Sequence, residues 1–155
     1  MIKLKQVLAI ALLAMLLVGC NQQEDNRVQT KDNNIDFTKV TNKDAPVNQS
    51  VATKAKQLLL DNKEVNGVRG INTTDKILLA FKVKQLDSFR ETKLEGEFKS
   101  DLEKEFPNKE IFISSDQKIF IELDRLEKEI QNNKMDKSQL NKDFDTIQKL
   151  INDEA

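Results

Sequence analysis

The chain has 155 residues, one of them a cysteine and none of them histidine, tryptophan or tyrosine, and its formal net charge is −1. This length suits one domain with its own core. Without histidine the commonest general base and metal ligand is absent, and a lone cysteine excludes an internal disulfide. The slightly acidic balance argues against nucleic-acid binding and against a polybasic membrane patch, since both need a basic surface.

The first 20 residues have the layout of a secretion signal. Lys3 and Lys5 precede an apolar run from Val7 to Val18, as in the basic and hydrophobic regions of a signal peptide. A transmembrane helix is the alternative, but this run has 12 residues and a span needs about 20. The run ends in a segment similar to a bacterial lipobox: Leu17, Val18, Gly19 and Cys20. The similarity implies cleavage before Cys20 and a diacylglycerol on its sulfur, with two or more acyl chains giving a stable membrane anchor.

Asn21 to Asn48 is rich in Asn, Gln, Asp, Lys and Thr, and this composition predicts a disordered tether. As a flexible coil it would span roughly 30 Å, with an extended limit of about 90 Å. Ile35, Phe37 and Val40 are apolar exceptions that could form a short strand, although disorder is the preferred interpretation. We therefore expect a signal peptide over residues 1–19, lipidated Cys20 with a tether over 20–48, and an α+β domain over 49–155. The mature chain would carry a formal charge of −3, because Lys3 and Lys5 are removed.

The first half of the domain has the pattern of a helix followed by a hairpin. A helix is predicted from about Pro46 to Asn62, with Asp44 as a candidate cap. A strand follows over Val65–Ile71, where two glycines indicate a bend or bulge. Lys76–Lys84 is the clearest strand, because Ile, Leu, Phe and Val alternate along it and its lysines point to the other face.

The second half alternates helix, strand and helices. Ser88 and Glu91 form a capping box for a helix that Pro107 ends. Glu110–Ser114 is a short strand, after which Ser115 or Asp116 can cap a helix, and a last amphipathic helix follows Asp136. The order α-β-β-α-β-α plus a terminal helix predicts an α+β fold, a three-stranded sheet with helices on one face. The expected core comprises Leu58, Phe81, Val83, Phe98, Leu102, Ile111, Ile113, Leu123 and Ile130.

No reactive constellation emerges from the remaining residues. Acidic pairs such as Asp101 with Glu105, or Glu122 with its neighbours, have the spacing of a solvated helix face rather than of paired catalytic carboxylates. Ser114 and Ser115 have no histidine and no nucleophile elbow, so capping is the preferred role. Residues 67–70, Gly-Val-Arg-Gly, superficially match a KH loop, but they lie in or beside a strand. We expect no catalytic, cofactor-binding or metal-binding residues.

Two segments carry a resemblance to a known family. The run Ile111-Phe112-Ile113-Ser114-Ser115-Asp116 leads into a helix, and Val65-Asn66-Gly67-Val68 precedes the strand around Leu78-Leu79-Ala80-Phe81. With the lipobox and the polar tether, this layout resembles the YhcN/YlaJ-like sporulation lipoproteins. The chain departs from the family in its hairpin turn, Asn72-Thr73-Thr74-Asp75 in place of a Thr-Gly turn, and in its charged terminal helix. The resemblance implies a small domain, related in topology to BON-type and ring-building modules, with no established enzymatic activity.

Two functional interpretations follow. The first is a non-enzymatic lipoprotein, lipid-anchored on the extracytoplasmic face of a spore membrane, by expectation the inner one, that acts in sporulation or germination by contacting another protein. The second is a general cell-envelope binding or assembly module, such as a secretion or conjugation accessory. Neither requires a cofactor, a nucleic acid or a small-molecule substrate.

Overall fold

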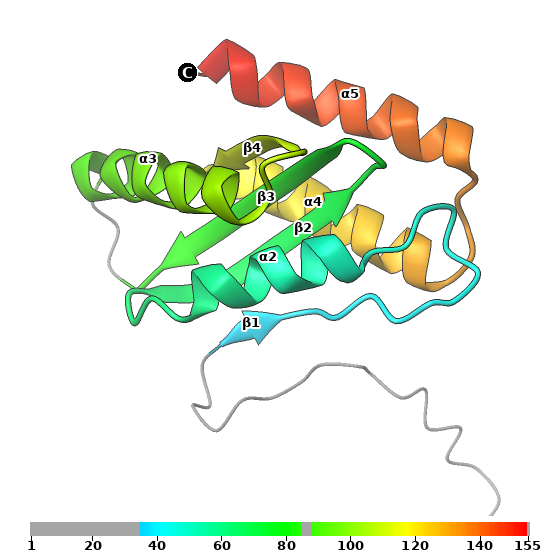
Figure 1. The fold of residues 1–155 in the computed structure, drawn as a ribbon, viewed down its shortest axis with the longest axis horizontal. Coiled ribbons are helices and arrows are strands. Elements are labelled where there is room, and N and C mark those ends of the chain that lie inside the picture. Colours follow the sequence, from blue (N-terminus) through cyan, green and yellow to red (C-terminus); the bar gives the residue numbers. More distant parts are fainter. Residues whose placement is uncertain (1–34, 85–87, 155) are drawn as a thin grey trace, which may run out of the picture.

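The computed structural model of the protein describes residues 35–84 and 88–154 (Figure 1). The signal peptide, the lipobox and Cys20 lie outside the described residues. In chain order the elements are β1 (Asp36–Phe37), α2 (Ser50–Leu60), β2 (Val65–Asn72), β3 (Lys76–Val83), α3 (Ser88–Glu105), β4 (Glu110–Ser114), α4 (Gln117–Gln131) and α5 (Lys137–Glu154).

The sheet has the strand order β1-β2-β3-β4. Strands β2 and β3 form the predicted antiparallel hairpin, with a register shift between Val65 and Gly67 where a bulge was expected. Strand β4 pairs parallel to β3. Strand β1 pairs parallel to β2 through Asp36–Gly67 and Phe37–Val68. The predicted α+β class is confirmed, but the sheet has four strands rather than three because the apolar residues before Asn48 supply β1.

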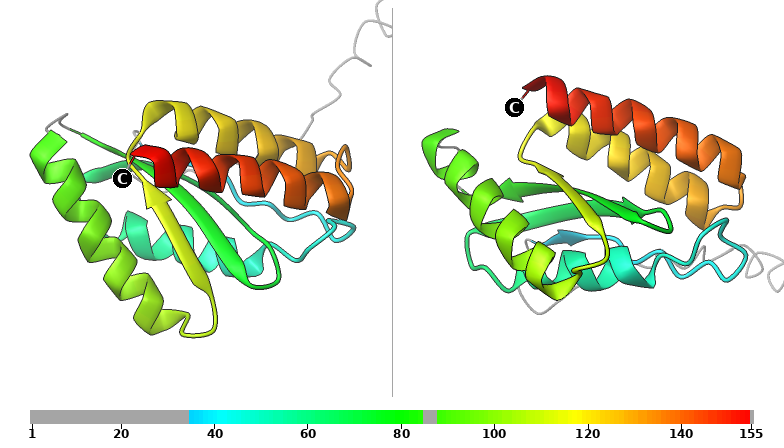
Figure 2. Two further views of the ribbon diagram at one scale, coloured as in Figure 1. Left: turned by 90° about the horizontal axis from the view of Figure 1, so that it is seen from above. Right: turned by 45° about the horizontal axis from the view of Figure 1, so that its top comes forward.

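Helices cover both faces of this sheet, and the prediction of helices on one face is wrong. One core cluster packs α2 and α3 against the sheet, and the other packs α4 and α5 against the opposite face (Figure 2). The reason lies in β3, where Ile77 and Leu79 point to one cluster and Leu78 and Ala80 to the other. On the second face of β3, Lys76 and Lys82 flank the buried residues Leu78 and Ala80, so a strand buried on both sides was mistaken for a half-exposed one.

Eight of the nine predicted core residues are buried, but they divide between the two clusters. Leu58 is the exception, with 39% of its surface exposed. The buried face of α2 contains Ala52, Ala55 and Leu59, and the charged residue Lys56 completes it. Leu58 therefore lies off that face, one residue away from Leu59 and about 100° around the helix.

Helix ends match the predictions in part. The Asp116 side chain accepts hydrogen bonds from the backbone N–H groups of Lys118 and Ile119, at 2.6 and 3.0 Å, and caps α4. Helix α2 begins at Ser50 rather than near Pro46, and Asp44 is not its cap. No helix within the described ranges is both long and apolar enough to cross a membrane.

Residues 35–48 pack onto the domain, which corrects the prediction of a tether reaching Asn48. Phe37 and Val40 are buried. Farther along, Thr41 N–H donates to Gln131 Oε1 at 2.8 Å, and Asn42 Nδ2 donates to the Ile130 carbonyl at 2.7 Å. We call residues 35–48 the strap. It binds because three apolar side chains spaced over six residues suffice to bury a segment whose composition is otherwise polar.

Candidate functional site

A surface hollow with a volume of about 660 Å³ lies at the carboxyl ends of β3 and β4. Lys82, Val83 and Lys84 line it from the end of β3, and the first turns of α3 and α4 contribute Glu91 and Gln117. Parallel strands of α/β sheets commonly present binding residues at this end. The position therefore makes the hollow the first candidate for a contact site.

The hydroxyl and carboxyl groups around this hollow are engaged in local hydrogen bonds. Ser114 Oγ accepts from the Asp116 N–H at 3.0 Å, Glu95 accepts from the Ser115 N–H, and the Asp116 carboxylate caps α4. Both serines thus lie beside the helix cap, as the sequence suggested. The chain has no histidine that could act as a general base for a hydroxyl.

The acidic residues singled out in the sequence stay on exposed helix faces. Asp101 pairs with Lys104 at 2.9 Å, Glu105 pairs with Lys54, and Glu122 pairs with Arg125 at 3.1 Å. Across residues 35–84 and 88–154, no three His, Cys, Asp or Glu side chains are grouped to hold a metal ion. Residues 67–70 lie inside β2, paired with β3, so they do not form a KH-type loop.

A second polar site, buried between the strap, α2, β2 and α4, was not predicted. Lys56 Nζ lies 2.5 Å from Glu127 Oε1, and both side chains are fully buried. The same oxygen accepts the Gly70 N–H at 2.8 Å. Arg69, whose side chain is 3% exposed, pairs with Asp124 at 2.6 Å and with Asp36 at 2.5 Å. We call these residues the ion cluster: Asp36, Lys56, Arg69, Asp124 and Glu127.

Burial sets the protonation of the cluster. It lowers the pKa of Lys56 and raises the pKa of Glu127, in each case against the pull of the other member of the pair. For Asp124, burial acts to raise the pKa, but hydrogen bonds from Lys128 and Arg69 hold it below its ordinary value. The Asp124 carboxylate is thus held in its ionised form, whereas desolvation opposes ionisation of both Lys56 and Glu127.

The cluster fastens the strap. Arg69 Nη1 donates to the Asp36 carbonyl at 3.0 Å, Lys56 Nζ donates to the Thr38 carbonyl, and the Lys56 ammonium lies 5.3 Å from the centre of the Phe37 ring. Charged side chains from α2 and β2 therefore bind both the backbone and the ring of the strap. Their role is to hold the strap in one register.

A sequence signal for this cluster existed but was overlooked. Lys56 occupies the buried stripe of α2, Arg69 interrupts an otherwise apolar strand, and Glu127 lies on the buried side of α4 beside Leu126. A charged residue at a core-facing position is costly unless it is paired. Three such residues, two basic and one acidic, could have been matched to one another by that argument.

Comparison with known proteins identifies the family. The chain matches the model of the sporulation lipoprotein family YhcN/YlaJ over residues 19–151. No curated protein and no solved structure matches it. The match covers the described domain as far as Ile151 and starts at Gly19, so it also includes Cys20 of the predicted lipobox. The chain therefore belongs to the YhcN/YlaJ family of sporulation lipoproteins and is a membrane-anchored lipoprotein by its family.

Proposed function

We propose that this protein is a non-enzymatic lipoprotein of the spore membrane, anchored through Cys20 on the extracytoplasmic face of the inner membrane, that acts in sporulation or germination by binding another protein. The observation that carries the proposal is the family match over residues 19–151. It supplies the sporulation setting and the lipoprotein class. The protein contact and the place in the spore are our own extension.

The chemistry of the domain supports binding rather than catalysis. The buried ionisable groups are occupied in fastening the strap, the Ser114 hydroxyl accepts the Asp116 N–H, and the Ser115 N–H donates to the Glu95 carboxylate. A general base and a nucleophile must lie within hydrogen-bond reach of one another. Among the residues that the structure describes, histidine and cysteine are absent, and the Ser114 hydroxyl oxygen accepts the Asp116 N–H.

The hollow has the mixed character of a transient protein interface. Val83, Ile113 and Ile151 give it an apolar part, while Lys82, Lys84, Glu91 and Glu95 give it charges of both signs. Phe89, in the first turn of α3, is 83% exposed. An apolar centre with a polar rim and a nearby aromatic side chain is typical of surfaces that bind a protein segment.

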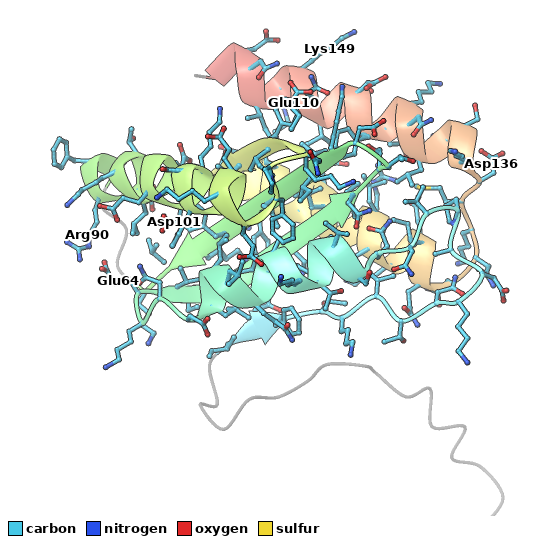
Figure 3. All side chains as sticks on the ribbon, viewed as in Figure 1. Glu64, Arg90, Asp101, Glu110, Asp136 and Lys149 are labelled. Carbon is cyan, nitrogen blue, oxygen red and sulfur yellow. The ribbon has the colours of Figure 1, made fainter. Side chains whose placement is uncertain are left out.

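Genetics in the spore-forming host tests the proposal. A deletion strain should grow normally but form fewer spores or germinate more slowly, and the wild-type gene should restore both. The double variant Lys84→Glu/Glu91→Lys reverses two charges that line the hollow and should restore them poorly. Lys149→Glu, on the outer face of α5, is the matched control and should restore them fully (Figure 3).

Three outcomes would contradict the proposal. A deletion that slows vegetative growth and leaves spores normal would favour the general envelope module. Full rescue by the charge-reversed variant, at wild-type protein level, would exclude the hollow as the contact surface. Rescue by a soluble form that lacks Cys20 would show that anchoring is dispensable.

A further inference from the structure

Packing of the strap onto the domain shortens the linker between the lipid and the domain. Because Ile35 is already part of the packed structure, only residues 21–34 connect Cys20 to it. These 14 residues reach about 50 Å when fully extended and roughly 20 Å as a flexible coil. The domain is thus held close to the lipid surface, and always by the same point of attachment.

That point lies next to an exposed apolar side chain. Asp36, Lys82, Ile121 and Lys128 line a second hollow of about 260 Å³. Ile121 is 56% exposed. Lys82 Nζ sits 3.9 Å from the centre of the Phe120 ring, so its ammonium lies over the ring in a cation–π contact. The exposed face of α4 and the start of the strap therefore form one continuous surface.

Two of the lysines of this surface are not neutralised. Within the described part of the chain, Lys82 and the exposed Lys39 of the strap form no ion pair, whereas Asp36 and Asp124 are already paired with Arg69. These two described acids of the surface are thus compensated from inside the protein. The surplus of charge at this surface is positive, although the whole chain is slightly acidic.

We propose that this surface, defined by Asp36, Lys39, Lys82, Ile121 and Lys128 and called here the tether edge, rests on the lipid surface of the membrane that carries the anchor. Ile121 enters the headgroup region, and Lys39 and Lys82 lie over anionic headgroups. The outer face of α5, which carries Lys149, lies on the opposite side of the molecule from β1 and points away from the lipid (Figures 1 and 3). The proposal rests on the lipid anchor but not on the protein contact proposed above.

Tryptophan fluorescence can test this orientation cleanly, because the chain contains no tryptophan. The full lipoprotein is purified from membranes and reconstituted into vesicles of phosphatidylethanolamine and phosphatidylglycerol. Ile121→Trp and the control Lys149→Trp each supply the sole tryptophan. We expect Ile121→Trp to emit at shorter wavelength than Lys149→Trp. We also expect brominated lipid to quench Ile121→Trp at least twofold more strongly. Equal quenching at the two positions would overturn the proposal.

The strap and the charges are tested separately. The variant Phe37→Ser/Val40→Ser is added to Ile121→Trp to remove the buried side chains of the strap, which doubles the length of the linker to the lipid. Quenching should then fall to the level of the Lys149→Trp control. Circular dichroism verifies that the domain stays folded. Undiminished quenching would refute the role of the strap. Lys39→Glu should reduce quenching in anionic vesicles but not in phosphatidylcholine vesicles, and an equal effect in both would refute the electrostatic part. No protein partner is present in these vesicles, so failure here would leave the proposed protein contact intact.

Discussion

Removing Lys56 gives the sharpest test of the ion cluster. In Lys56→Met the fully buried Glu127 carboxylate keeps only the Gly70 N–H at 2.8 Å and the more distant Arg69 Nε at 3.6 Å. The strap also loses the hydrogen bond to the Thr38 carbonyl and the contact with the Phe37 ring. Breaking a buried ion pair by removing one partner costs about 3–5 kcal/mol. We expect a loss of that size in the free energy of unfolding.

Lys54→Met is the matched control, since Lys54 lies on the same helix and also pairs with a glutamate, Glu105, but both of these side chains are exposed. An exposed pair contributes about 0–1 kcal/mol. Urea unfolding followed by far-ultraviolet circular dichroism measures both losses. If the two variants lost the same free energy to within about 1 kcal/mol, at unchanged dependence on urea, the buried pair would not fasten the strap.

The dependence on pH separates a charge effect from a packing effect. Burial raises the pKa of Glu127 in the folded protein, and loss of Lys56 removes the interaction that opposes this rise. A carboxyl whose pKa is raised by folding makes the folded state less stable as the pH rises above the ordinary value, here 4.5. The loss in Lys56→Met should therefore be smaller at pH 5 than at pH 7. Adding Glu127→Gln should restore part of the stability at pH 7, and a further loss would contradict this explanation.

Four further predictions concern the core, the glycines, the acid response and the anchor. Phe81→Ala and Leu123→Ala should each cost about 2–5 kcal/mol in urea unfolding, whereas Lys82→Ala should cost far less; equal tolerance would refute the two-sided core. Gly70→Ala should destabilise the folded protein, because the added Cβ would lie 2.8 Å from the Leu78 carbonyl oxygen. Gly96→Ala has no atom within 4 Å of its added Cβ and should stabilise α3 by about 0.5–1 kcal/mol. Thermal melting that ranks the two variants the other way would contradict the close approach at Gly70. Asp124 has a lowered pKa in the folded state, so its contribution is present above its ordinary value of 3.8 and is lost as the pH falls through the lowered one; Asp124→Asn should lose less stability than the wild type between pH 5 and pH 2. Cys20→Ala should accumulate as an unprocessed precursor, and a mature protein of unchanged mass in the detergent phase would show that Cys20 is not the lipidated residue.

Local sequence patterns predicted the elements well. The stripe of α5 is buried as expected, at Leu140, Phe144, Ile147 and Ile151. Asp116 caps α4, and the β2–β3 hairpin has its expected pairing. These features depend on neighbours within one or two turns or on a short connection. Periodicity and turn chemistry carry that information directly.

The features that were missed depend on contacts between distant segments. Strand β1 has two residues, and its pairing with Gly67 and Val68 spans about 30 positions of the chain. Helices α4 and α5 were placed on the wrong face, because the alternation in β3 was taken as a buried and an exposed side. Lys56 and Glu127, separated by 71 positions, meet only after the sheet has formed. Periodicity within a single element does not predict a contact between residues this far apart in the chain. The charged residue within each apolar stripe was nevertheless visible in the sequence.

The ion cluster and the strap together close one edge of the sheet. Strand β1 covers β2 at Gly67 and Val68, Glu127 accepts the Gly70 N–H, and the Gln49 side-chain amide both donates to and accepts from the Asn72 backbone, each at 2.9 Å. An open strand edge invites pairing with another chain. Here side chains take up the hydrogen-bonding groups that β1 is too short to reach. A second chain therefore cannot add a strand to β2 without displacing the strap. The other edge strand of the sheet is β4, and the hollow at the carboxyl ends of β3 and β4 offers side chains to a partner.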